Sequence, residues 1–415
     1  MNYREISACR ISGSTNLVPV LDLGQQALTG VFPKTRQEKV TTGPVSLVWC
    51  PESGLVQMKQ SYDLKEMYGD NYGYRSGLNQ SMVNHLNELV TLVMGFRSGR
   101  ASHEPLTVLD IGGNDGTLLK AYPSHFEKIL VDPTAPKWMA HYVGTSIWPV
   151  SHFFDSRFVE NHGEASVDII TSIAMLYDLE NPREFMRDIA YALKPTGVWL
   201  FEQSHLPQML KTCAYDTICH EHLEYYSLKV IMKLLDEAGL EAIHAFTNDT
   251  NGGSFGVVAA HKGAKFVEQA SIDKVLAMEK DLDKPSAYIN FKKKVELHRT
   301  RLIALIEDLN NKGHTVAGLG ASTKFNVLLQ YCGFTQKDIG FIIDVNPFKD
   351  GRFTPGSLIP IVNEEQGHAI GADYLLVGPW HFKKGIIERE KEFLKNGGAL
   401  IFPLPELEIV TDCEE

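Results

Sequence analysis

A glycine-rich turn after an apolar run is the first segment whose residues could do chemistry. The strand-like run Thr107–Leu109 leads into Asp110, and the turn Gly112–Gly116 precedes an apolar stretch that predicts a helix from Thr117. Glycine lets the backbone approach a ligand closely, because a Cβ at such a position would collide with it. A strand end, a glycine-rich turn and a helix start form a crevice for a nucleotide. The alternative is a turn that merely joins strand to helix.

A second acid and the charge of the loop favour one ligand. Asp132 ends the next predicted strand, about 20 residues further on, where a doubly wound fold places a carboxylate on ribose hydroxyls. The turn lacks the full Gly-x-Gly-x-x-Gly spacing and carries Asp110 and Asp115. Carboxylates are compatible with the positive charge of a sulfonium, whereas they repel a negatively charged pyrophosphate. We therefore expect the methyl donor S-adenosylmethionine as cofactor. The predicted contacts are Asp110, Gly112, Gly113, Asn114, Gly116, Asp132, Asp155 and Ser156.

Three titratable residues, His220, Glu221 and His222, form a cluster in the middle of the chain. Histidine suits proton transfer, because its unperturbed pKa of about 6.5 lies close to neutral pH. The cluster does not fit a helical metal site, since histidines at i and i+2 do not share a helix face. It is either catalytic or an exposed turn before a helix that Ser227 caps.

A second glycine-containing turn, Gly318–Ala321, lies far downstream and is followed by Lys324. It separates a predicted strand from a predicted helix, a layout that brings backbone N–H groups and one cation to a phosphate. Asp344 ends the next predicted strand, and Lys349 and Arg352 add positive charge that could meet a diphosphate. These four side chains are the predicted substrate contacts. In the alternative interpretation the turn is structural and Lys324 is solvated.

The hydrophobic patterns that position these residues divide the chain into four parts. Residues 1–75 hold short strand-like runs broken by glycine and proline, which predict a small β lobe. Residues 76–265 alternate strands and helices and predict a doubly wound, donor-binding sheet. Residues 266–312 predict a helical connector, and residues 313–415 predict a smaller Rossmann-like domain. The expected fold is multidomain α/β.

The composition of the chain limits the kinds of binding partner and the cellular location that we expect. Lys and Arg total 40 against 51 Asp and Glu, for a formal net charge of -11, so we expect no nucleic-acid partner. No apolar run approaches the about 20 residues of a membrane helix, and Met1–Arg10 lacks the plan of a signal peptide. The six cysteines are scattered, which is typical of reduced thiols. We expect a cytoplasmic protein that acts on a small molecule, and the oligomeric state stays open.

Motifs along nearly the whole chain resemble the family of nucleotide-sugar C-methyltransferases, which act at C3 of 4-keto-deoxy sugar nucleotides. One matching segment is the glycine-rich turn Asp110–Gly116, which we call the donor turn. The others are Tyr72–Gly77, Cys219–Ser227, Asn251–Ser254, Gly318–Lys324, Asp344–Arg352 and Thr354–Gly356. The resemblance implies an N-terminal zinc-binding lobe and a central S-adenosylmethionine domain. It also implies a C-terminal α/β domain that helps to hold a nucleoside diphosphate 4-keto sugar.

The chain departs from the family pattern in two places. The family's zinc lobe has two Cys-x-x-Cys pairs, whereas this chain has Cys9 with Ser12 and Cys50 with Ser53. A serine hydroxyl is a far poorer zinc ligand than a thiolate, and two sulfurs do not close a tetrahedral structural site. Structural zinc is therefore doubtful, and we predict no metal site. The second departure is Cys219, which stands where the family has a tyrosine.

The reaction that the resemblance implies is carbon methylation, which requires a base. The carbonyl of a 4-keto sugar acidifies the hydrogen on C3, and a side chain near neutral pKa must remove it. His222 is the predicted base, and Glu221 would orient a partner or bond a sugar hydroxyl. The carbanion would then attack the sulfonium methyl in line.

Other residues have less specific predicted roles. His220 or His205 would donate to the developing oxyanion, and Tyr72 or Tyr74 would complete the pocket. Two other functions stay open. The same donor site would serve an O- or N-methyltransferase acting on another sugar or small metabolite. The changed cysteine positions and Cys219 are also compatible with a protein that binds the donor without catalysis.

Overall fold

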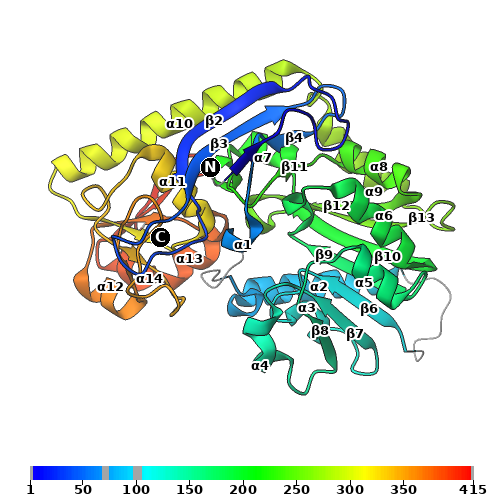
Figure 1. Cartoon of the computed structure of the whole chain (residues 1–415). Helices are drawn as coiled ribbons and strands as arrows, with labels where there is room; N and C mark the ends of the chain where they lie inside the picture. Colours follow the sequence, from blue (N-terminus) through cyan, green and yellow to red (C-terminus); the bar gives the residue numbers. More distant parts are fainter. Residues whose placement is uncertain (1–2, 68–73, 97–104, 413–415) are drawn as a thin grey trace.

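The computed structural model describes residues 3–67, 74–96 and 105–412. Within these ranges the strands form a four-stranded, a seven-stranded and a six-stranded sheet, together with one two-stranded ribbon. Figure 1 shows the four-stranded sheet across the top, with the seven-stranded sheet below it on the right and the six-stranded sheet below it on the left. The multidomain α/β architecture predicted from the sequence is confirmed.

The N-terminal lobe contains a strand from a distant part of the chain. Its antiparallel order is β11-β4-β3-β2, and β1 pairs with β5 beside it. The strands are β1 (Tyr3–Glu5), β2 (Val18–Ala27), β3 (Thr42–Trp49), β4 (Val56–Met58), β5 (Gln60–Tyr62) and β11 (Glu224–Tyr225). Because β11 follows directly after His222, the histidine cluster lies at the border between the lobe and the central domain.

The central domain is a doubly wound sheet with the order β12-β13-β10-β9-β6-β7-β8. The five strands from β10 to β8 are parallel, and β13 is antiparallel to both of its neighbours, β10 and β12. The strands are β6 (Thr107–Ile111), β7 (Glu127–Val131), β8 (Ile147–Val150), β9 (Val167–Ile173), β10 (Leu193–Ser204), β12 (Leu240–Asn248) and β13 (Ser254–His261). Parallel strands end at one edge of a sheet, so Asp110 and Asp132 are brought together there.

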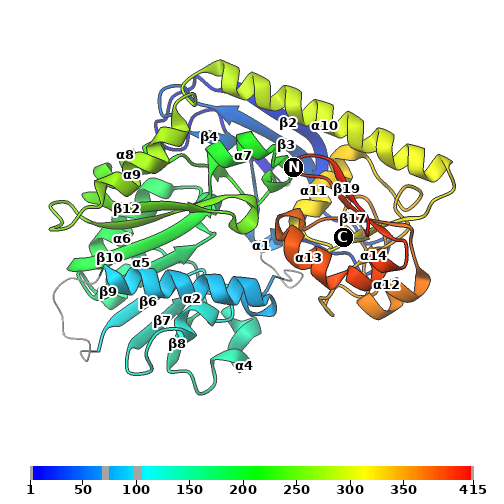
Figure 2. The same ribbon diagram turned by 180° about the vertical axis from the view of Figure 1, so that it is seen from behind.

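Helices cover both faces of this sheet, as its alternating apolar residues require. Val108 packs with Met82 on one face, while Leu109 packs with Phe185 on the other. The helices are α2 (Gln80–Gly95), α3 (Thr117–Lys120), α4 (Met139–Tyr142), α5 (Ser156–His162), α6 (Pro182–Ala192), α8 (Leu228–Glu237) and α9 (Gln269–Leu276). Figure 2 shows α2 lying across one face of the sheet. Ser227 caps α8 as predicted, since its hydroxyl accepts from the Val230 N–H at 3.3 Å.

The C-terminal domain repeats the pattern on a smaller scale. Its sheet has the order β16-β15-β14-β17-β18-β19, with only β19 antiparallel. The strands are β14 (Val316–Leu319), β15 (Ile342–Ile343), β16 (Ile361–Val362), β17 (Tyr374–Val377), β18 (Ala399–Phe402) and β19 (Glu408–Val410). The helices are α11 (Thr323–Cys332), α12 (Glu364–Ile370), α13 (Lys383–Arg389) and α14 (Lys391–Lys395).

One long helix, α10 (Pro285–Asn311), ties the lobe to the C-terminal domain. It runs beside β2 and β3 in both views (Figures 1 and 2), and the Tyr288 ring lies 4.8 Å from that of Trp49. The shorter helices α1 (Leu64–Met67) and α7 (Leu206–Thr212) lie near the junction of the three bodies. Among the described residues, no helix combines the length and apolarity needed to cross a membrane.

Candidate active site between the central and C-terminal domains

A cavity of about 560 Å³ opens where the central domain faces the C-terminal domain. Its wall combines three segments that are far apart in sequence: Asp110–Asn114 of the donor turn, the cluster residues Glu221 and His222, and the first turn of α11 with Lys324. We call it the central cavity. Its volume lies within the usual range of pockets that bind one small-molecule ligand or cofactor.

The donor turn follows β6 and bends back over Asp110. Gly112 has a φ of +74°, and a Cβ on Gly113 would lie 2.8 Å from an oxygen of Asp110 and 2.9 Å from Leu130. Asn114, with a φ of 49°, is left-handed as well, a conformation that asparagine tolerates better than most residues. Gly113 thus packs too closely against Asp110 and Leu130 to carry a side chain, and the backbone of Gly112–Asn114 forms a cradle at the cavity wall.

Two carboxylates at adjacent strand ends flank this cradle. Asp110 accepts a hydrogen bond from the Thr171 hydroxyl at 2.7 Å, and burial raises the pKa of Asp110 to about 7. Asp132 accepts from the backbone N–H of Asn114 at 2.8 Å and from that of Thr134 at 2.6 Å. Because a cation close to a buried acid favours its charged form, a sulfonium compound would complement Asp110.

Three predicted donor contacts do not line the cavity. Gly116 packs against Tyr142 and Ile147. Asp155 starts α5, where it accepts from the Arg157 N–H at 3.1 Å, and Ser156 is the first residue of that helix. In their place, the preceding aromatic residues Phe153 and Phe154 line the cavity, where their rings offer a flat apolar surface to a purine.

Glu202, near the end of β10, is a cavity residue that was not predicted from the sequence. This buried carboxylate lines the cavity and is held by His85 Nε2 at 2.7 Å and by the Asn248 amide at 2.7 Å. A signal for it exists in the sequence, because the strand-like run Val198–Glu202 ends on this acid and the ends of parallel strands converge on the ligand.

His222 is held in one tautomer by the backbone. Its Nδ1 lies 2.7 Å from the Thr217 carbonyl oxygen, which can only accept, so Nδ1 carries the proton and Nε2 keeps its lone pair. The Tyr177 ring packs edge-on against it, with 4.3 Å between centroids. Burial and, to a smaller extent, the charge of Lys324 lower the pKa of His222 to about 4, against the opposing effect of the Thr217 hydrogen bond. The imidazole is therefore neutral at pH 7 and can accept a proton.

Burial raises the pKa values of Glu221 and Cys219, which line the cavity beside His222. Glu221 accepts from the Thr29 hydroxyl of the lobe at 3.3 Å, and burial raises the pKa of Glu221. Burial also raises the pKa of the Cys219 thiol well above its ordinary value, and Glu221 adds to this shift. Cys219 is therefore a thiol at neutral pH and not a nucleophilic thiolate.

The structure does not bring all predicted catalytic residues to the cavity. His220 donates from Nε2 to the Gln26 carbonyl at 3.1 Å and thereby ties the cluster to the lobe. His205 is fully buried, with Nδ1 3.0 Å from the Gln208 side chain. Neither lines the cavity, whereas Tyr74 does and is half exposed. Tyr72 lies outside the described residues.

On the C-terminal side, Lys324 alone of the four predicted substrate contacts lines the cavity. It lies in the first turn of α11 and donates to the Asn251 carbonyl, and burial lowers its pKa. Asp344 instead accepts from the Ala321 N–H at 2.7 Å, so it shapes the turn.

The other two predicted contacts are occupied elsewhere. Lys349 donates to the Ala321 carbonyl at 2.8 Å, and Arg352 donates to the Phe32 carbonyl at 3.0 Å. Ser322 and Thr323 line the cavity beside Lys324 and were not predicted. Since Ser322 caps α11 by accepting from Phe325 N–H at 3.1 Å, the cavity faces a helix N-terminus.

The four positions that would hold zinc lie together in the lobe. Cys9 Sγ is 3.3 Å from Ser53 Oγ, and Ser12 Oγ is 3.5 Å from Cys50 Sγ. Two thiols and two hydroxyls do not fit a closed structural zinc site, which takes four thiolate or imidazole ligands. Across the described part of the chain, no three His, Cys, Asp or Glu side chains are grouped to hold a metal.

A glycine-rich turn after the first parallel strand, with carboxylates at this strand end and the next, is a layout that binds an adenosine-containing ligand. Fold and site together thus define an S-adenosylmethionine-dependent methyltransferase. Family models match the chain in three consecutive parts: a zinc-binding domain over residues 9–68, a methyltransferase domain over 86–245, and a C-methyltransferase C-terminal domain over 249–405. Together these three matches support a C-methyltransferase family for the chain.

The chain is also similar to individual proteins. The chain is 29% identical to the C-methyltransferase NovU of Streptomyces niveus over 98% of both chains. A chain from the complex of the Haloferax volcanii Trm112 activator with a methyltransferase is 15% identical, covering 45% of this chain and 94% of that one, with a TM-score of 0.37. A Clostridium acetobutylicum methyltransferase is 12% identical over 44% and 92% of the two chains, with a TM-score of 0.35. These two structural similarities carry no conclusion about substrate.

Proposed function

We propose that the protein transfers a methyl group from S-adenosylmethionine to C3 of a nucleotide-linked 4-keto-deoxyhexose. The observation that supports this most directly is the bond from His222 Nδ1 to the Thr217 carbonyl at 2.7 Å. It leaves Nε2 as a base on a side chain that lines the same cavity as the donor turn. A carbon acceptor needs such a base, because its proton must leave before the carbon can attack.

The proposed reaction has two steps. His222 Nε2 takes the proton from C3, the C–H electrons form the C3–C4 double bond, and the carbonyl oxygen becomes an enolate. The enolate then re-forms the carbonyl as C3 attacks the sulfonium methyl, and the sulfur–methyl bond breaks to give S-adenosylhomocysteine. The proton on His222 returns to water. Rate enhancement comes largely from holding the two reactants in line.

The donor and the nucleotide sugar bind to different sides of the cavity. The donor binds the central domain, within residues 76–265, through Asp110, Gly112, Gly113, Asn114 and Asp132, with Phe153 and Phe154 against the adenine. The nucleotide sugar binds toward the C-terminal domain, residues 313–415, where Lys324 adds a positive charge.

Proton exchange tests the proposal. The protein is incubated in deuterated water with 4-keto sugar nucleotides, and loss of the C3 hydrogen is followed by NMR. Wild type should exchange this hydrogen and His222→Asn should not. The matched control is His125→Asn, since His125 is an exposed histidine away from the cavity.

The outcome also separates the rival functions. Methylation without C3 exchange would reject the carbon mechanism in favour of O- or N-methylation. Tight donor binding without turnover on any 4-keto sugar nucleotide would favour a non-catalytic role.

A further inference from the structure

Two turns in the N-terminal lobe repeat the same backbone geometry. In the first, Cys9 N–H donates to the Ser14 carbonyl at 2.8 Å, and Gly13 N–H donates back to the Cys9 carbonyl at 2.9 Å. In the second, Cys50 N–H donates to the Leu55 carbonyl at 2.9 Å, and Gly54 N–H donates to the Cys50 carbonyl at 2.8 Å. Both glycines have a positive φ, +71° and +83°. Each turn therefore presents one cysteine and one serine in the same way.

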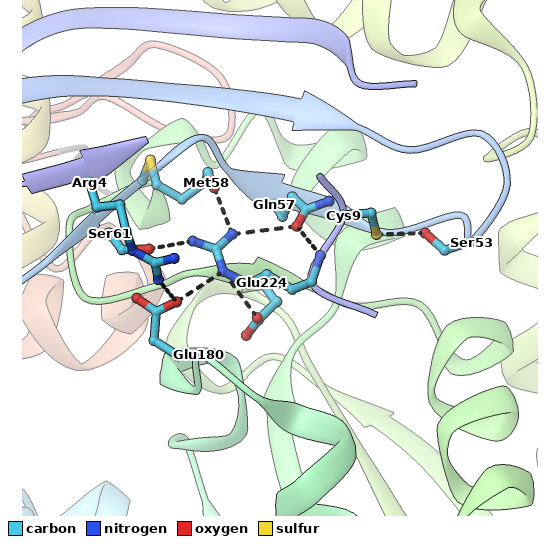
Figure 3. A network of polar contacts seen from close by, with 9 residues as sticks. Arg4, Cys9, Ser53, Gln57, Met58, Ser61, Glu180 and Glu224 are labelled. Atoms are coloured by element: carbon cyan, nitrogen blue, oxygen red, sulfur yellow. Dashed lines mark hydrogen bonds and ion pairs between the residues drawn. The ribbon is translucent and has the colours of Figure 1, made fainter. Parts of the chain in front are cut away.

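The serine hydroxyls sit where second ligands of a metal site would be. Ser12 Oγ accepts from Ser14 N–H at 3.3 Å, and Ser53 Oγ accepts from Leu55 N–H at 3.1 Å. The turns then pair crosswise, Cys9 with Ser53 at 3.3 Å and Ser12 with Cys50 at 3.5 Å (Figure 3 shows the first pair). Sulfur ligands at about 2.3 Å from a tetrahedral zinc lie about 3.8 Å apart, so the atoms of each pair are spaced nearly as two ligands of one metal ion would be.

We propose that these two thiol–hydroxyl pairs hold the two turns of the lobe together without a metal ion. Replacing both serines by cysteine would then turn the same four positions into a zinc site. The disagreement with the matched zinc-binding domain lies in the donor atoms and not in the backbone. This inference does not depend on the methyl acceptor.

The buried guanidinium of Arg10 links the lobe to the central domain. Arg10 lies inside the first turn, and its guanidinium donates to the Met58 carbonyl at 2.7 Å and to the Ser61 hydroxyl at 2.8 Å. Its Nε is 3.8 Å from Glu224 of β11 and 3.7 Å from Glu180, which lines the central cavity (Figure 3). The side chain of Arg10 is only 3% exposed. Lobe and central domain are therefore joined by a fixed charge that no chelator removes.

The test compares metal content in full-length protein purified from zinc-supplemented cells. Wild type, Ser12→Cys/Ser53→Cys and Ser14→Cys/Ser53→Cys are analysed by mass spectrometry after gel filtration, and cobalt is added to look for tetrahedral thiolate absorption. The last variant is the matched control, because it adds the same two thiols while the Ser14 hydroxyl accepts from Asn16 N–H and does not contact Cys50. Wild type and control should retain no zinc, and the first variant about one zinc per chain.

Two results would overturn the inference. The first is stoichiometric zinc in wild type whose removal by EDTA lowers the melting temperature, a measurement that does not depend on whether any variant folds. The second is a Ser12→Cys/Ser53→Cys protein with native circular dichroism that holds no more zinc than the control. Neither result would affect the proposed methylation, because proton exchange at C3 is measured separately.

Discussion

The pH dependence of C3 deprotonation provides a quantitative test of His222. Burial lowers the pKa of this imidazole to about 4, against about 6.5 for an ordinary histidine. At about pH 6 an ordinary histidine would be about three-quarters protonated and inactive as a base. His222 would be protonated in about one molecule in 100. Because its pKa is depressed, acid removes the base only as the pH falls toward about 4.

The assay is kcat/KM for exchange of the C3 hydrogen in deuterated water, measured without the donor from about pH 8 to about pH 5. Omitting the donor excludes Asp110, whose pKa of about 7 would affect sulfonium binding in this range. The predicted rate varies by less than about twofold. An ordinary histidine would lose about fourfold at about pH 6 and about 30-fold at about pH 5.

Glu221→Gln serves as the control for this profile. Burial raises the pKa of Glu221, so its titration could otherwise be mistaken for that of the base. The variant should keep the flat profile whatever its absolute rate. A midpoint near about pH 6.5 in both proteins would refute the argument from burial.

Other perturbations test the donor turn and the buried charges. Gly113→Ala places a Cβ 2.8 Å from an oxygen of Asp110, so calorimetry should show donor affinity weakened by about 10- to 100-fold. Asp110→Asn should weaken S-adenosylmethionine more than S-adenosylhomocysteine, and wild-type affinity for the sulfonium should fall as the pH drops through about 7 in binding titrations. Arg10→Met removes the cation beside the buried Glu224 and should lower the free energy of unfolding in urea by about 3 kcal/mol. His220 has a pKa lowered to about 4 by burial, so the unfolded chain binds the extra proton below about pH 6.5. Stability should therefore decrease as the pH drops below about 6.5, and it should decrease less steeply in His220→Asn.

Local signals were enough to predict the donor turn. A strand, a glycine-rich turn and an acid at the next strand end are fixed by neighbouring residues, and the structure brings Asp110, Gly113 and Asp132 to one cavity. The alternation of strand-like and helical patterns also predicted the parallel sheets. The structure agrees, because β9, for example, is buried along almost its whole length, as an inner strand should be.

Side chains on loops were harder to place, because residue type does not say which way a loop turns. Asp155 and Ser156 have polar groups suited to an adenosine, yet they begin α5, and Phe153 and Phe154 line the cavity. Lys349 has a charge suited to a diphosphate, yet its amine is held by the Ala321 carbonyl.

Pairing between distant segments explains the remaining differences. The sequence gives no local sign that Glu224–Tyr225 forms a strand of the lobe, because its partner β4 lies far earlier in the chain. That pairing directs His222 into the cavity and turns His220 toward the Gln26 carbonyl of the lobe. The different environments of the two histidines therefore arise from tertiary contacts.

The most direct test of the account follows the methyl group itself. The protein is incubated with S-adenosylmethionine carrying a ¹³C-methyl group and with 4-keto sugar nucleotides, and the labelled product is examined by NMR. We expect a methyl carbon bonded to C3 of the sugar, formed by wild type and not by His222→Asn. A label on oxygen or nitrogen, or carbon methylation that survives loss of His222, would contradict it.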